Sequence, residues 1–151
     1  AVKHIFSFFL TLMLASTAFA AEKAPEANAP LNSYEQIMVG KVWVTTDAVD
    51  QKGASMPATD ENVAAFFGKA EYFPDHTFKI TSLDGKPRMH GLWSISADGK
   101  TRTLTVQDDS GKTRFTREVE NVKVNDGEYT YRIYPNGENK AEHIDIIHKP
   151  Q

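Results

Sequence analysis

Five dipeptides that end in glycine divide most of this chain into short segments, and this spacing constrains the fold more than any other feature. Each dipeptide joins Asp, Asn or Ser to Gly, the combination that favours the tight turns of β-hairpins. The turns lie 10 to 16 residues apart, which leaves room for one strand between each turn and the next. They are Asp84-Gly85, Asp98-Gly99, Ser110-Gly111, Asp126-Gly127 and Asn136-Gly137.

The segments between the turns are rich in β-branched and aromatic residues, as strands are. They predict strands over residues 41–46, 69–73, 77–83, 89–96, 102–107, 113–119, 122–124, 128–134 and 143–148. Parallel strands would need helical crossovers, but only Asp60–Phe67, followed by Gly68, has a helical pattern. We therefore expect an all-β fold: an antiparallel up-and-down barrel of about eight to nine strands with one or two short helices.

Alternation along the predicted strands separates an apolar face from a polar face, because neighbouring side chains in a strand point to opposite sides. One solvent-exposed face and one buried face on each strand favour a closed barrel. Closure also removes the unpaired strand edges that promote aggregation. The apolar rows are Phe78 with Ile80; Met89, Gly91, Trp93 and Ile95; Leu104 with Val106; Phe115 with Val119; Tyr129, Tyr131 and Ile133; and Ile144 with Ile146.

Residues 1–20 have the three parts of a Sec signal peptide. Lys3 supplies the positive region, Ile5–Leu14 is almost entirely apolar, and Ala18-Phe19-Ala20 has the small-x-small form that signal peptidase cleaves. The apolar run is shorter than the roughly 17 to 25 residues of a membrane-spanning helix. We expect cleavage after Ala20 and an exported chain, periplasmic or secreted, with no transmembrane segment in its mature form. Because no cysteine follows the run, we also expect no lipid anchor.

The remaining residues, 21–151, are the length of one domain, here a barrel over residues 33–151. Residues 21–32 are rich in Ala, Pro and Glu and predict a flexible leader, followed by a capping box over Ser33–Gln36. The chain has no cysteine, so disulfides do not hold the fold. Its net charge of −3, with both signs interleaved, argues against nucleic acid as a partner.

Segments along most of the mature domain carry a family resemblance: residues 43–46 with Asp50 and Gly53, residues 68–73, 91–93, 98–100, 129–132 and 143–150. Together, from about Val42 to Pro150, they resemble one secreted bacterial family, named domain of unknown function forty-eight twenty-two. The resemblance implies a barrel like those of the calycins, the group that includes lipocalins, and it implies no activity or catalytic residue. A loose similarity to the lipocalin entry motif, at Gly40-x-x-Trp43, further implies that Trp43 packs under Arg132 at the closed end of the barrel; the alternative is an ordinary buried tryptophan and a solvated arginine.

Residues with catalytic or metal-binding chemistry form no recognised pattern. His90, His143 and His148 could ligate a metal, but five positions separate His143 from His148, so in one strand the two point to opposite faces. No nucleophile elbow or phosphate-binding glycine loop is present, and no pair of carboxylates is singled out, although Asp145 lies between Ile144 and Ile146. The sequence therefore indicates no cofactor and assigns no enzymatic activity.

Two functions remain open from sequence. In the first, the barrel binds a small hydrophobic or amphipathic ligand in a cup, although the same side chains could fill the interior of a barrel of this size. In the second, the barrel core is solid and the chain is an envelope interaction or stress protein that contacts an unknown protein partner through loops such as Val49–Asn62. The residues predicted to line the cup are Trp93, Tyr131, Phe78, Phe115 and Met89.

Overall fold

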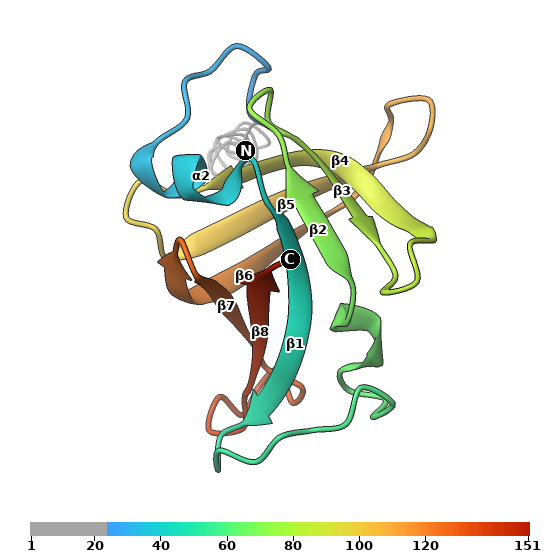
Figure 1. Ribbon diagram of the computed structural model, residues 1–151, viewed down its shortest axis with the longest axis vertical. Helices are drawn as coiled ribbons and strands as arrows, with labels where there is room; N and C mark the ends of the chain where they lie inside the picture. Colours follow the sequence, from blue (N-terminus) through green and yellow to red (C-terminus); the bar gives the residue numbers. More distant parts are fainter. Residues whose placement is uncertain (1–23) are drawn as a thin grey trace, which may run out of the picture.

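The computed structural model describes residues 24–151, so the predicted signal peptide, with its cleavage site at Ala18–Ala20, lies outside the described residues. These residues form one antiparallel barrel with two short helical segments (Figure 1). In chain order the elements are α2 (Ser33–Met38), β1 (Val42–Asp50), the 3-10 helix η3 (Ala64–Phe66), β2 (Lys69–Tyr72), β3 (Thr77–Thr81), β4 (Pro87–Ile95), β5 (Thr101–Gln107), β6 (Thr113–Asn125), β7 (Glu128–Ile133) and β8 (Ile144–Pro150).

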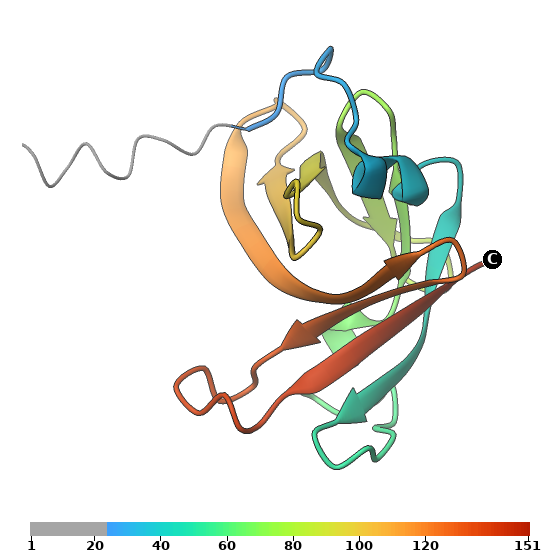
Figure 2. The same ribbon diagram turned by 90° about the vertical axis from the view of Figure 1, so that its left-hand side faces the viewer.

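Every strand pairs antiparallel with the next, and β8 returns to β1, with Trp43 opposite Pro150 and Asp50 opposite Ile144. The barrel is therefore closed, and the predicted fold class is confirmed with eight strands. The two strands predicted over 113–119 and 122–124 form one strand, β6, which curves around the barrel (Figure 2). A register shift between Asn121 and Lys123 lets the ladder to β7 continue past Val122, whose side chain is exposed.

The barrel has two ends with different contents. Because all strands are antiparallel, the α2 end also carries the turns 73–76, 96–100 and 126–127. The η3 end carries the long connection 51–68, the turns 82–86 and 108–112, and the connection 134–143.

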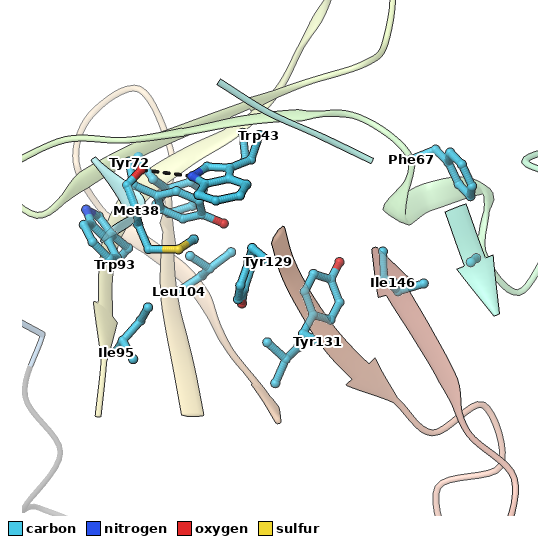
Figure 3. Packing of buried hydrophobic residues seen from close by; sticks show 14 of the residues in the cluster. Met38, Trp43, Phe67, Tyr72, Trp93, Ile95, Leu104, Tyr129, Tyr131 and Ile146 are labelled. Atoms are coloured by element: carbon cyan, nitrogen blue, oxygen red, sulfur yellow. Dashed lines mark hydrogen bonds between the residues drawn. The ribbon is translucent and has the colours of Figure 1, made fainter. Parts of the chain in front are cut away.

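The α2 end is closed by side chains. Met38 and Trp43 are completely buried, and the Trp43 indole Nε1 donates to the carbonyl of Met38 at 3.0 Å. Buried aromatic and aliphatic side chains from β1, β2, β4, β5, β7 and β8 continue this packing into the interior (Figure 3). The interior is therefore largely filled from this end, as expected for a barrel of eight strands.

The helix cap differs from the predicted one by one residue. Asn32 caps α2: its side chain accepts from the backbone amide of Glu35 at 2.9 Å, and the Glu35 carboxylate accepts from the Asn32 amide at 2.9 Å. The predicted box over Ser33–Gln36 is thus corrected, because Asn32 can also donate to the carbonyl of Ile95 in β4, which fixes the start of the helix.

The described part of the leader, from residue 24, contacts the barrel and does not extend freely from it. His76 in the β2–β3 turn is buried, and its Nε2 lies 2.9 Å from the carbonyl oxygen of Ala29. One backbone carbonyl of the segment predicted as a flexible leader, that of Ala29, therefore bonds with a barrel side chain.

The helix predicted over Asp60–Phe67 is shorter in the structure, where only Ala64–Phe66 is helical. The segment instead turns to meet the barrel wall: the Thr45 hydroxyl donates to the carbonyl of Phe66 at 2.9 Å. Gly68 then packs against β3 so closely that a Cβ atom there would lie 2.4 Å from the carbonyl oxygen of Thr81. This contact holds η3 beside the barrel opening.

Candidate functional site

One arginine lies inside the barrel. Arg102 is on β5, on the same face as Leu104 and Val106, and its exposure is 3%. Its Nη1 donates to the Tyr72 hydroxyl at 2.9 Å, and its guanidinium carbon lies 4.8 Å from the ring centre of Tyr131. In the part of the chain that the structure describes, Nε of Arg102 has no hydrogen-bond partner and no carboxylate forms an ion pair with this side chain.

A buried guanidinium of this kind is costly. Moving a charge from water into a protein interior costs several kcal/mol, normally offset by an opposite charge and a full set of hydrogen bonds. The tyrosines around Arg102 offset part of this cost, because their ring faces attract the cation and one hydroxyl accepts a hydrogen bond. They do not supply a negative charge at neutral pH. Burial raises the pKa of Tyr131 to about 12, against the opposing effect of Arg102, and raises the pKa of Tyr129 well above its usual value.

Arg102 lines a cavity of about 30 Å³ in the barrel. One water needs roughly 10 to 15 Å³ by this measure, so the space is that of about two waters or of the two oxygens of a carboxylate. The cavity is not sealed: three of its wall residues, Ile80, Arg88 and Met89, also line a surface groove of about 530 Å³ at the η3 end. Its remaining wall residues are Thr45, Ala65, Phe66, Gly68, Lys69, Ala70, Tyr72, Leu104, Arg117, Tyr131 and His148.

The wall of this cavity is basic. In the described range, 24–151, the arginines Arg88, Arg102 and Arg117 contribute to it and no Asp or Glu does. Arg88 donates through Nη1 to the carbonyl of Phe67 at 2.5 Å, which ties it to the segment after η3. The wall therefore carries positive charges without a negative charge among its own residues.

Arg117 is a partly exposed residue of the cavity wall. Its guanidinium carbon lies 5.7 Å from the ring centre of Phe66 in η3 and 5.6 Å from that of Phe115 in β6. Phe66 in turn packs edge-on against Tyr131, with ring centres 6.3 Å apart. A cation between two aromatic rings thus stands between the interior and solvent.

His148 is the second buried ionisable group at the cavity. Its Nδ1 lies 2.9 Å from the carbonyl oxygen of Tyr129, and its ring stacks on Tyr129 and Tyr131 with ring centres 5.5 and 5.2 Å away. Burial lowers the pKa of His148 to about 4, and the positive charge of Arg102 acts in the same direction. The imidazole is therefore neutral at neutral pH.

The five residues predicted to line a cup do not lie together. Tyr131 and Met89 line the cavity. Trp93 and Phe78 belong to the packed core, where Trp93 donates to the carbonyl of Phe73 at 3.0 Å and lies 5.0 Å from the Tyr72 ring. Phe115 is 38% exposed, because β6 carries its side chain beyond the packed interior to the opening.

The stacking of Arg132 on Trp43 is corrected by the structure. Arg132 follows Tyr131 in β7 and so points out of the barrel, where Nε and Nη2 donate to the Asp145 carboxylate at 2.7 and 3.1 Å. The cation over the Trp43 ring is instead Nζ of Lys41, at 5.3 Å. The ion pair also gives Asp145, singled out in the sequence, a role on the outer surface.

The three histidines considered as metal ligands are separated. His148 is inside the barrel, while His90 is exposed and its Nε2 lies 3.2 Å from Asp109 Oδ1. The backbone amide of His143 donates to the Gln51 side chain in the adjacent loop, at 3.3 Å. Among residues 24–151, no three His, Cys, Asp or Glu side chains are grouped so that they could hold a metal ion.

A second buried polar cluster lies at the α2 end. The Glu35 carboxylate accepts from the backbone amide of Ile95 at 3.0 Å, and its Oε2 lies 3.9 Å from Nδ1 of His76. Both ring nitrogens of His76 also face backbone carbonyls, those of Trp93 and Ala29. Since these contacts join α2 and the leader to the barrel, we regard the cluster as structural.

The basic cavity was missed in the sequence, although the signal was present. Alternation puts Arg102 on the face of Leu104 and Val106, and it puts Arg117 on the face of Phe115 and Val119. An arginine on an apolar row breaks the pattern and indicates a charge that the fold carries inward. Alternation also puts His148 on the same face of β8 as Ile144 and Ile146.

A comparison with family models places this chain in a family. The model described as Domain of unknown function (DUF4822) matches residues 35–151, which include all eight strands. The family resemblance seen in the sequence is thereby confirmed. A search of curated proteins finds no match. Within the described residues, no helix has the length and apolar character needed to cross a membrane.

Proposed function

Since the chain belongs to this family, whose description assigns no activity, we propose a function from the barrel itself: it binds a small amphipathic molecule through one anionic group, which lies in the interior cavity beside Arg102. The observation that carries this proposal is a buried guanidinium with an unpartnered Nε and no acidic neighbour in the described residues. A carboxylate in the cavity supplies the missing negative charge, and one whose oxygen reaches Nε also supplies the missing hydrogen-bond acceptor.

The size and shape of the cavity support a ligand with a small charged end. A space of about 30 Å³ holds the two oxygens of a carboxylate but not a whole hydrocarbon chain. We expect the chain of such a ligand to leave past Ile80 and Met89, which line both the cavity and the surface groove. This arrangement narrows the ligand expected from sequence, which was hydrophobic or amphipathic, to an amphipathic anion.

Calorimetry with octanoate as the probe tests the proposal. We expect wild-type protein at pH 7 to bind octanoate with a dissociation constant below about 1 mM, and octan-1-ol and octylammonium at least tenfold more weakly, because only octanoate offers an anion. Replacing Arg102→Met should weaken octanoate binding by at least about tenfold, or 1.4 kcal/mol. Arg132→Met, which removes an arginine from the outer surface, should leave it unchanged. Equal binding of octanoate and octan-1-ol, or no binding of either, contradicts the proposal.

We also propose that the chain acts outside the cytoplasm, on the basis of the signal-peptide features of residues 1–20. Expression of the chain in a bacterium, followed by fractionation and mass measurement, tests this. A periplasmic or secreted product that begins at Ala21 supports it, and a cytoplasmic product that retains residues 1–20 contradicts it.

A further inference from the structure

We propose that the cavity binds its anion together with one proton, and that Nε2 of His148 holds this proton; the inference rests on the proposed anion site. The reaction is then the association of protein, anion and one proton from solvent. It makes binding of the ligand tighter as the pH falls.

The hydrogen bond of the imidazole fixes which nitrogen is available. A carbonyl oxygen only accepts, so Nδ1 of His148, 2.9 Å from the carbonyl of Tyr129, must carry a hydrogen. In the neutral ring the second nitrogen, Nε2, is therefore an acceptor with a free lone pair. Because His148 lines the cavity, this nitrogen is the one basic atom of the ring that can take up a proton there.

The groups around His148 oppose its protonation as long as no anion is bound. Arg102 packs on the same two tyrosine rings as His148 does, with its guanidinium carbon 5.7 Å from the Tyr129 ring centre and 4.8 Å from that of Tyr131. A proton on His148 would place a second positive charge beside the first, in an interior without carboxylates along the described wall. The ionisable side chains that line the cavity around His148 are Tyr72 on β2, Arg88 on β4, Arg102 on β5, Arg117 on β6 and Tyr131 on β7; Lys69 alternates with Ala70 and points to the outer face of β2.

An anion reverses this balance. Its negative charge cancels the effect of Arg102 on His148, and a protonated Nε2 can donate a charge-assisted hydrogen bond to it. The low pKa of His148, about 4, leaves a wide range below neutral pH over which such a rise can take place. The cavity is thus suited to bind an anion together with a proton, since Arg102 supplies a permanent positive charge and His148 supplies a base that can take up the proton.

Calorimetry in two buffers of different ionisation enthalpy measures protons taken up for each ligand bound. We use octanoate and octanesulfonate as probes, because the sulfonate does not titrate between pH 5.5 and 8 and so excludes proton uptake by the probe itself. For wild-type protein we expect uptake that approaches one proton for each ligand at pH 5.5 and little at pH 8. The dissociation constant should fall by about tenfold between pH 7.5 and 5.5, which corresponds to a rise in the pKa of His148 from about 4 to about 6.5 on binding.

The variant His148→Gln keeps N–H donors that can reach the Tyr129 carbonyl but does not titrate, so it should bind octanoate without proton uptake. Because this variant could fail to fold, NMR titration of His148 in wild-type protein gives a second readout. We expect its pKa to rise from about 4 to about 6.5 when octanesulfonate is bound.

The outcomes separate the two proposals. Proton uptake with both probes, and a raised pKa of His148, support the inference. Binding without proton uptake and with an unchanged pKa overturns the inference but leaves the anion site standing. No binding of either probe between pH 5.5 and 8 overturns the anion site and the inference with it.

Discussion

The stability of the variant Arg102→Met shows whether Arg102 serves ligand binding or is needed for folding. The variant Arg102→Met removes a charged hydrogen bond to the Tyr72 hydroxyl, worth about 1.5 to 3 kcal/mol, and contacts with two tyrosine rings, worth about 0.5 to 2 kcal/mol each. It also removes an unpartnered buried Nε–H, which costs about 1 to 3 kcal/mol, and the desolvation of the guanidinium, which costs several kcal/mol.

These two sets of terms oppose each other, so we expect the free energy of unfolding to change by no more than about 2 kcal/mol, because methionine refills much of the space. Urea denaturation measures this change, provided that the dependence of the free energy of unfolding on urea concentration is the same for the variant and the wild-type protein. Arg132→Met, which breaks a partly exposed ion pair, is the control and should cost about 0 to 1 kcal/mol. A loss above about 4 kcal/mol for Arg102→Met would refute the reasoning, since it would mean that the interior needs the guanidinium in order to fold.

Three further predictions concern stability. The pKa of His148 is about 4 in the folded chain against 6.5 for a free histidine, so the unfolded state binds more protons between these values. The free energy of unfolding should therefore fall by up to about 3 kcal/mol from pH 6.5 to pH 4, and a flat urea midpoint across this range for wild-type protein would contradict the assignment. Gly91→Ala should destabilise by more than about 3 kcal/mol, because φ is +153° and the added Cβ would lie 2.0 Å from the Thr105 carbonyl oxygen. The matched variant Gly85→Ala, at φ +91° with open space, should cost only about 1 to 2 kcal/mol, and equal thermal melts of the two would argue against the close approach of β4 and β5. Glu35→Ala should cost about 2 to 4 kcal/mol by urea denaturation, since it leaves the buried amide of Ile95 without its acceptor, and a change below 1 kcal/mol would show that the cluster does not hold α2.

The strands could be predicted because the turn residues and the alternation act locally. The row Met89, Gly91, Trp93 and Ile95 of β4 lies on the inner face as expected, and the glycine-containing turns separate the strands. The helix cap was placed one residue late, because the deciding contact is the long-range bond from Asn32 to Ile95, which no local pattern contains.

The site was harder to predict than the fold for a physical reason. Phe115 and Trp93 lie on apolar rows, but a row does not say how far along the barrel axis a side chain lies, so it did not separate the exposed opening from the filled end. The sequence alone does not single out Arg102 as a buried residue, because arginine side chains are normally solvated. What identifies it is the closed topology, in which this position of the inner face is buried.

NMR of the Arg102 side chain tests most directly whether its Nε–H is the donor to the ligand anion. In ¹⁵N-labelled wild-type protein the resonance of this group, assigned by its loss in Arg102→Met, reports on its hydrogen bonding. We expect octanoate at saturating concentration to shift this resonance downfield and to slow its exchange with water, and octan-1-ol to leave it unchanged. An Nε–H resonance that does not respond to bound octanoate would contradict an anion site at Arg102.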